Sequence, residues 1–293
     1  MKNTFSIQQL QKKIFTRLPL QGIVLLLVVL MSVMFFGLRG MPVNSSTAQE
    51  VRLPILMYHQ LTKDTCLVNE YCITKDQFAG DLAALKEMGY ETVSMAQVIA
   101  FCERGEPLPV SKPIVISFDD GFESFYVYAF PLLKKHAMKA VLGVIGEEAE
   151  RFSNSEDHRL KYSCCTWDQL TEMAESGLVE IESHTWNLHS KKNGRKGAAK
   201  KFGESAEAYR TLLEKDVGAT REAYQKHRLP DFSVYVYPYG AFSGESPEIL
   251  RSLGVRAAFV CDARVNVLRV GETAPLMELK RFNRVPGTFC IKE

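Results

Sequence analysis

Four segments of this chain share one layout, in which a short apolar run leads directly into side chains that can bind a metal or move a proton. In a β/α barrel the loops that follow the parallel strands converge on one face and build the active site. We therefore expect the four segments to meet there, and their residue types favour metal-assisted hydrolysis. The runs are LPILMYH (Leu53–His59), PIVISFDDG (Pro113–Gly121), LVEIESHTWNLH (Leu178–His189) and FSVYVYPYG (Phe232–Gly240).

Asp119 and Asp120 follow the apolar residues 114–118 and precede Gly121. Adjacent residues at a strand end point in different directions, so one carboxylate can bind a metal while the other faces a substrate. Two like charges this close also separate their protonation equilibria, which suits one ligand and one base. An isolated Asp-Asp-Gly indicates only a turn, and it is the preceding apolar strand that favours a site.

His184 and His189 lie five residues apart, just after another apolar run. Two imidazoles and one carboxylate form a set that holds a divalent metal and leaves positions open for water and substrate. A pair of histidines at this spacing also arises by chance, but these are two of only six in the chain. We interpret His136, His158 and His227 as ordinary surface histidines.

The segments ISFDDGF, SHTWNLH and YPYG together resemble the motifs of the polysaccharide deacetylases (carbohydrate esterase 4, NodB-homology), in order and in spacing. The resemblance covers about residues 53–293. It implies an α/β fold, a distorted (β/α) barrel with fewer than eight strands. It also implies that the protein uses a divalent metal to remove N-acetyl groups from a glycan. The metal we expect is Zn²⁺, with Co²⁺, Ni²⁺ or Mn²⁺ as alternatives.

The resemblance assigns a role to each motif residue. It implies that Asp119 is the base that activates water. The implied metal ligands are Asp120, His184 and His189. The implied wall of the substrate groove is Tyr237, Pro238, Tyr239 and Gly240, where the Tyr239 backbone N–H helps to hold the oxyanion. Trp186 has two open interpretations, stacking on a sugar ring or packing against the barrel.

Three features depart from the usual family pattern. The two histidines are five rather than four residues apart, Val236 replaces the arginine before the Pro-Tyr turn, and no histidine follows His227. All three departures resemble the exported deacetylases of poly-β-1,6-N-acetylglucosamine. In that branch an early Met-Tyr-His supplies the general acid, here His59, whose alternative interpretation is a histidine satisfied at a strand edge. Val236 implies that the residue orienting Asp119 is missing, which is the best support for a non-catalytic glycan-binding protein. An O-acetyl esterase of another polysaccharide would share the mechanism.

Helical and strand patterns alternate along residues 51–293, which favours an α/β fold with a mainly parallel sheet. Residues 151–162 are polar and irregular, and we expect a surface insertion there. The expected helices are Thr74–Met88, Ser94–Cys102, Ser124–His136, Thr166–Ser176, Glu204–Arg228 and Pro247–Ser252. The expected strands are Ile114–Phe118, Ala140–Ile145, Val179–Ser183, Val234–Tyr237 and Val255–Val260.

Residues 22–38 form an uncharged apolar run that is long enough for one membrane-spanning helix. Basic residues lie mainly before the run, so we expect residues 1–21 in the cytoplasm, 39–50 as a linker and 51–293 as an extracytoplasmic domain. The alternative is a signal peptide cleaved near Ala48, which would release the domain. Both versions place the domain outside a bacterial-type cell membrane.

Composition narrows the class of protein further. A chain with 46% hydrophobic and 24% charged residues is globular, and a net charge of +2 favours no nucleic-acid partner. The basic run Lys191–Lys201 is either a solvated loop or a contact for an anionic polymer. Seven cysteines in an exported chain permit disulfides and leave one thiol over, and Cys66 and Cys72 are close enough to clip one loop.

Overall fold

The computed structural model describes residues 49–287 and residue 289. Among these residues no helix is long and apolar enough to cross a membrane. The predicted membrane-spanning run 22–38, the cytoplasmic tail and nearly all of the linker lie outside the described residues. The membrane prediction therefore stays a prediction.

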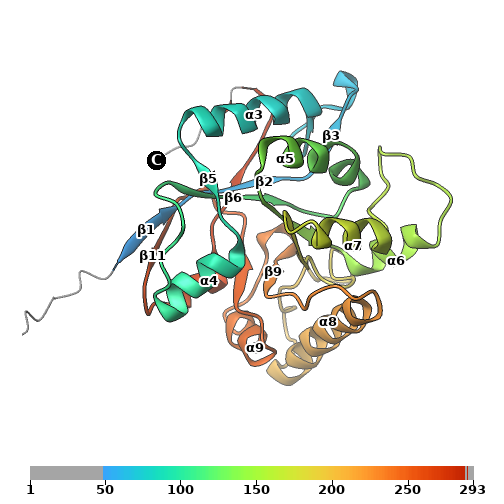
Figure 1. Cartoon of the computed structure of the whole chain (residues 1–293). Helices are drawn as coiled ribbons and strands as arrows, with labels where there is room; N and C mark the ends of the chain where they lie inside the picture. The colour runs from blue at the N-terminus through green and yellow to red at the C-terminus, as the bar shows by residue number, and fades with distance from the viewer. Residues whose placement is uncertain (1–48, 288, 290–293) are drawn as a thin grey trace, which may run out of the picture. The chain divides into compact units, whose positions relative to one another are not determined.

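A curved parallel sheet forms the centre of the described domain (Figure 1). Seven strands follow one another in the order β10-β9-β8-β7-β6-β2-β12, and the short β5 (Glu91–Thr92) pairs with the start of β6 as an eighth member. No ladder among the described residues joins β10 to β12, and a parallel bridge between Phe259 of β10 and Leu279 is the contact that spans this gap. This agrees with the predicted α/β class and distorted barrel. The seven strands are β2 (Ile55–Tyr58), β6 (Pro113–Phe118), β7 (Ala140–Val144), β8 (Val179–Ser183), β9 (Val234–Val236), β10 (Ala257–Phe259) and β12 (Phe282–Asn283).

The strands are apolar on both faces because both faces of the sheet are covered. In β6, Val115 packs into the inner core, whereas its neighbours Ile114 and Ile116 pack into the outer one. The two-residue period of a strand thus sorts each side chain to the inside or the outside of the barrel.

Helices cover the sheet, and most of them contribute to the outer core (Figure 1). Helix α4 is the exception, since its apolar residues pack into the inner core. Glutamine-closed capping boxes start α3 and α7 as predicted, at Thr74 and Thr166, and each cap contributes about 1 kcal/mol. The helices are α3 (Lys75–Glu87), α4 (Met95–Arg104), α5 (Phe130–His136), α6 (Gly146–Ser153), α7 (Trp167–Glu175), α8 (Ala206–Lys226) and α9 (Ser246–Ser252).

Three elements differ from the predictions. Helix α6 covers residues 146–153, where we expected a polar insertion from 151, and it has no side-chain cap that would announce it. The expected helix 124–136 begins with a π-helical turn, η2 (Phe125–Ala129), before α5. The run 53–59 is interrupted at Pro54, which has no N–H for the ladder, so β1 (Glu50–Leu53) leaves the parallel sheet. It pairs instead with β11 (Asn266–Arg269), antiparallel.

The remaining elements are short. β3 (Gln60–Thr62) and β4 (Cys72–Thr74) form a separate parallel pair. Three 3₁₀ turns complete the described chain, namely η1 (Thr65–Leu67), η3 (Pro238–Gly240) and η4 (Ala274–Glu278).

Candidate metal centre and cleft

The carboxyl ends of β2, β6 and β8 bring the predicted residues together. His59 follows β2, Asp119 follows β6 and His184 follows β8. Alternate residues of a strand face the same side of the sheet. Ile55 is four residues before His59 and Val115 is four before Asp119, and both pack into the inner core. All three side chains therefore lie on the inner face of the sheet, at the carboxyl ends of the strands.

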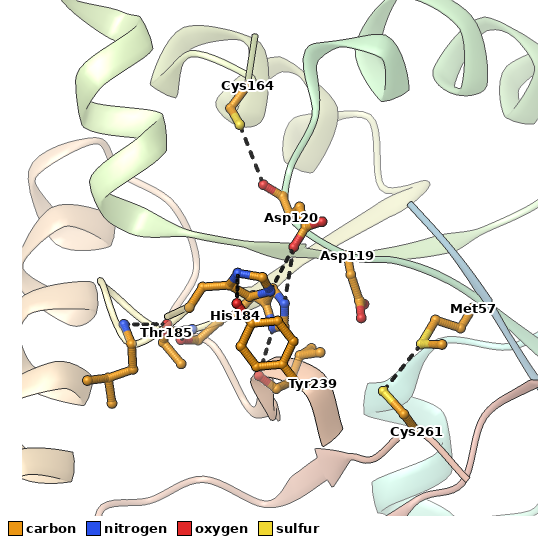
Figure 2. Close-up of polar contacts among 12 residues, drawn as sticks. Met57, Asp119, Asp120, Cys164, His184, Thr185, Tyr239 and Cys261 are labelled. Atoms are coloured by element: carbon orange, nitrogen blue, oxygen red, sulfur yellow. Dashed lines mark hydrogen bonds and ion pairs between the residues drawn. The ribbon is translucent and has the colours of Figure 1, made fainter. Parts of the chain in front are cut away.

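Asp120 reaches the same place by a backbone turn. Strand alternation would direct it outward, but its φ is 69°, in the left-handed region that aspartate tolerates better than most residues. Gly121 follows with a φ of 68°. Figure 2 shows the Asp120 carboxylate directed at the His184 ring, with Asp119 beside it.

Asp120, His184 and His189 form a compact group of possible metal ligands. Asp120 Oδ1 lies 3.3 Å from His184 Nε2 and 3.4 Å from His189 Nε2. The same Oδ1 atom is buried and accepts no hydrogen bond. A buried carboxylate oxygen without a donor is costly, and a cation between the three side chains would satisfy it.

The far nitrogens of both rings support this fit. His184 Nδ1 donates a hydrogen bond to the Val236 carbonyl at 2.8 Å, which leaves the Nε2 lone pair facing Asp120. His189 Nδ1 lies 3.4 Å from the Tyr239 hydroxyl. Metal-binding histidines use their second nitrogen in this way. The donor set therefore fits a divalent cation that accepts nitrogen and oxygen ligands, such as Zn²⁺.

Asp119 is held by an arginine that the sequence motifs do not indicate. Arg281 Nη1 and Nη2 donate to its two carboxylate oxygens at 2.6 and 2.8 Å, and both side chains are buried. Our expectation that the orienting residue is missing because Val236 replaces the usual arginine is therefore wrong. Arg281 lies in the segment just before β12, and the pairing of Phe282 with Leu56 brings that segment beside β2.

Burial and charge together set the protonation of the site. Burial alone would raise the pKa of Asp119, but Arg281 and the neighbouring imidazoles outweigh it and hold that pKa well below its usual range. The pKa of Asp120 is also lowered, because His184 and His189 outweigh its burial. Burial lowers the pKa of His59, although the two aspartates act in the opposite direction. Asp119 is thus a carboxylate and His59 mainly neutral at pH 7.

A cleft of about 670 Å³ opens above these residues. Its lining includes all the predicted catalytic and metal-binding side chains. It also includes polar residues that we did not assign to the site, of which Lys191 and Lys196 belong to a feature noted in the sequence, the basic run. They are Gln60, Asn69, Tyr71, Lys191, Lys196, Cys261 and Asn283.

The predicted groove wall contributes one side chain to this cleft, Tyr239. Tyr237 lies on the outer side of β9, where it is buried and stacks on Phe242. Pro238 is buried too, and Gly240 is packed so closely on Cys261 that a Cβ would lie 2.7 Å from the Cys261 nitrogen. The alternation along β9 explains the outcome, because Val236 faces inward and Tyr237 must then face outward.

Trp186 lies against Gly146, where any side chain in place of glycine would collide with the indole ring. Trp186 does not line the cleft among the described residues, which favours the packing interpretation over sugar stacking. His158 is exposed, as expected of a surface histidine, and its Nδ1 lies 3.1 Å from the buried Glu123 carboxylate. His227 is half-buried and stacks on Trp167, so it is not a plain surface group. All six described cysteines are free, so Cys66 and Cys72 do not clip their loop.

The family of the chain follows from a match to residues 109–258, which carry Asp119, Asp120, His184 and His189. The matching family is described as polysaccharide deacetylase. The chain belongs to this family. The sequence resemblance is thereby confirmed.

Two relatives and two solved structures extend the comparison. A poly-beta-1,6-N-acetyl-D-glucosamine N-deacetylase of Escherichia coli is 31% identical over 210 residues, covering 64% of this chain but only 30% of that protein. One from Staphylococcus epidermidis is 27% identical, covering 66% of this chain and 62% of that protein. The chain thus spans less than two thirds of either relative.

The solved structures cover the fold more fully. A de-N-acetylase from Aggregatibacter actinomycetemcomitans superposes with a TM-score of 0.68 at 26% identity, covering 82% of this chain and 97% of that one. IcaB from Ammonifex degensii gives a TM-score of 0.65 at 28% identity, covering 80% and 92%. Both agree with the curved parallel sheet described above.

Proposed function

We propose that this protein is a divalent-metal-dependent hydrolase that removes N-acetyl groups from N-acetylglucosamine residues of a polysaccharide. One observation carries the proposal. A buried carboxylate, Asp119, is held by two nitrogens of Arg281 beside the Asp120, His184 and His189 ligand set, at the floor of an open cleft. A base next to a metal site is the arrangement that metal-dependent amide hydrolysis uses.

The residues divide the work as follows. Asp120, His184 and His189 would hold a divalent cation, which when bound polarises the amide carbonyl and acidifies water. Asp119 accepts the proton of the attacking water, and Arg281 keeps its two oxygens fixed while this happens. The depressed pKa of Asp119 ensures that it is unprotonated and ready to accept at neutral pH.

His59 donates a proton to the departing amine. Its ring lines the same cleft, and its Nδ1 is buried without a hydrogen-bond partner among the described residues. The lowered pKa of His59 makes its imidazolium a stronger acid, although a smaller fraction is protonated at pH 7. Each turnover adds one proton to Asp119 and removes one from His59. Exchange with solvent then returns both side chains to their starting protonation states.

The substrate we propose is a β-1,6-linked N-acetylglucosamine polymer or a related envelope glycan such as peptidoglycan. The names of the Escherichia coli and Staphylococcus epidermidis relatives support the first choice. We further propose an extracytoplasmic location with an N-terminal membrane anchor, supported by the apolar run 22–38 and the basic residues before it. An anchored enzyme of this kind meets secreted polysaccharide directly.

The alternative of a non-catalytic glycan-binding protein loses its main support. That alternative depended on the absence of an arginine beside Asp119, and Arg281 forms an ion pair with Asp119. An O-acetyl esterase would use the same residues and differ only in substrate, so the choice between amide and ester is made by experiment.

Acetate release by the purified full-length chain tests the proposal. We expect release from β-1,6-linked N-acetylglucosamine oligomers with added Zn²⁺ or Co²⁺, and its loss on treatment with a chelator. His184→Ala should lose bound metal and activity together. Release from O-acetylated xylan alone would identify an esterase, and a metal-loaded, folded chain that releases no acetate from any glycan would contradict the proposal.

A further inference from the structure

The basic run of the sequence borders the proposed catalytic cleft. Lys191 and Lys196 line it, and both are exposed. Two other cations of the same loop are paired, Arg195 with Glu204 at 2.5 Å and Lys200 with Glu245 at 2.7 Å. Within the described residues, Lys191 and Lys196 have no carboxylate at ion-pair distance. The cleft therefore carries two lysines without an ion-pair partner in the described part of the chain. Its own carboxylates are Asp119, which Arg281 pairs, and Asp120 of the proposed ligand set.

The loop that carries these lysines is held against the site. The Gly197 N–H donates to the Ser190 carbonyl at 2.8 Å. Gly197 has a φ of 57°, and a Cβ there would lie 2.6 Å from the Pro238 carbonyl oxygen. Because no side chain fits between the loop and the Pro238 turn, the lysines stay next to the cleft.

Lys191 is close to the ligand set. Its ammonium lies 4.6 Å from the centre of the Tyr239 ring, and that ring lies 4.5 Å from the His189 ring. The distance from Lys191 to the reaction centre is therefore comparable with the Debye length of about 8 Å at physiological salt. A charge at this distance acts on whatever charge the substrate carries.

We infer that Lys191 and Lys196 make the enzyme select sugars whose neighbours are still acetylated. The inference rests on the proposed function, because each N-deacetylation converts a neutral acetamide into an amine that carries a proton at neutral pH. At low ionic strength, where the Debye length is about 30 Å, an ammonium about 7 Å from a lysine is disfavoured roughly twofold. Two lysines would then disfavour an already deacetylated sugar in this cleft about fivefold, and about twofold at physiological salt. The product polymer would then be deacetylated at separated positions.

A binding site for an anionic group is the weaker explanation of the lysines. Protein sites for carboxylate or phosphate converge on the anion with an arginine fork or several backbone N–H groups. Here the Lys191 ammonium lies over an aromatic face, and neither lysine shares a hydrogen-bonded partner with the other. Two separate lysine charges act on a substrate through their electric field and do not form a binding pocket for an anion.

A cavity next to the cleft is lined by acidic residues and by neither lysine. This cavity of about 320 Å³ meets the cleft at Asp120, Phe122 and His189, and its walls include Glu147 and Glu148. Glu148 is paired with Arg151. Repulsion of an ammonium is thus expected in the lysine-lined cleft and not in the adjoining cavity, so the selection should depend on which neighbour is deacetylated.

Three matched oligomers test the inference with the full-length chain. One is a fully N-acetylated β-1,6-linked pentamer, and the others carry a single glucosamine on one or the other side of the reacting sugar. For the wild type we expect kcat/KM to be about fivefold lower for one of the two glucosamine isomers at pH 7 and about 0.01 M salt. In Lys191→Gln/Lys196→Gln this ratio should fall below about twofold. Lys192→Gln is the matched control, an exposed lysine of the same loop outside the cleft lining, and should keep the wild-type ratio.

The pH supplies a second readout. An amine comparable to an α-amino group loses its proton near pH 8, whereas lysine does so near pH 10.4. The discrimination should therefore vanish at pH 9 while both lysines remain charged. Equal rates on all oligomers at pH 7, or a ratio unchanged in the double variant, would overturn the inference.

A binding measurement separates this inference from the proposed function. The same affinity ratio between the oligomers should appear by calorimetry whether or not acetate is released. Absence of acetate release together with this ratio would reject the hydrolase and retain the selection by charge. Equal affinity for the neutral pentamer and for both glucosamine isomers would reject the selection by charge instead.

Discussion

Arg281 and Arg284 lie three residues apart, and each holds a buried aspartate with two nitrogens. Arg281 pairs with Asp119 at the cleft, and Arg284 pairs with Asp81 on α3 at 2.8 and 2.9 Å. The two carboxylates are almost equally buried, at 3% and 2% exposure. One pair belongs to the proposed active site, and the other ties α3 to the C-terminal segment.

The two pairs have opposite protonation behaviour. The pKa of Asp119 is lowered despite its burial, since Arg281 is reinforced by the His184 and His59 imidazoles. The pKa of Asp81 is raised, because burial outweighs Arg284 and the hydrogen bond from the Tyr58 hydroxyl. An arginine partner alone therefore does not determine the direction of the pKa shift of a buried aspartate, since burial and its other neighbours contribute.

A third buried aspartate, Asp216 on α8, extends the comparison because its hydrogen bonds come from neutral donors. It accepts the backbone N–H groups of Trp186 and Asn187 and the Tyr235 hydroxyl. Burial raises its pKa to about 6. Asp216 thus anchors the loop between the two proposed histidine ligands without taking part in the chemistry.

The sharpest test of the comparison removes the charge from each paired aspartate. Asp119→Asn should lower kcat for acetate release about 10³-fold while metal is retained, because the base is lost and the ligands are not. Asp81→Asn should lower stability and leave kcat within about twofold. Measured kcat, bound metal and urea unfolding decide it, and a fully active Asp119→Asn enzyme would reject the assignment of the base.

Removing each arginine separates orientation from stability. Arg284→Gln leaves a buried carboxylate unpaired and should cost about 3–5 kcal/mol in the free energy of unfolding, with kcat of the folded fraction unchanged. Arg281→Gln should have a similar cost and also reduce kcat about 10²-fold.

Arg281→Lys keeps the charge at the site but loses the two-pronged geometry. It should therefore fold and still show a reduced kcat. Unaltered turnover in this folded variant would show that Arg281 balances charge and does not orient Asp119.

The smallest expected effect concerns Asp216 and pH. A carboxyl group whose pKa is higher in the folded state than in the unfolded state binds protons more tightly when folded, so stability falls as pH rises between the two values. Relative to Asp216→Asn, the wild type should lose about 1 kcal/mol of stability between pH 5 and pH 7. Parallel urea titrations of both proteins measure this difference, and identical pH profiles would contradict the raised pKa.

Local sequence pattern predicted most of the scaffold. The capping boxes at Thr74 and Thr166 and the strand Val179–Ser183 are found where expected, since caps and two-residue alternation depend on neighbours in the chain. Helix α6 was missed because it is short and has no side-chain cap. The position of Tyr237 could have been found by extending the alternation of β9, because inward-facing Val236 requires Tyr237 to face the outer core.

The sequence by itself determined the candidates for the metal ligands and for the base, since Asp119, Asp120, His184 and His189 each follow an apolar strand and strand ends of a parallel sheet converge. Only the tertiary structure decided what surrounds them. Arg281 reaches Asp119 across 162 residues of chain, and it does so because β12 pairs with β2. Pairing between distant strands depends on the packing of the whole barrel, and no local spacing encodes it.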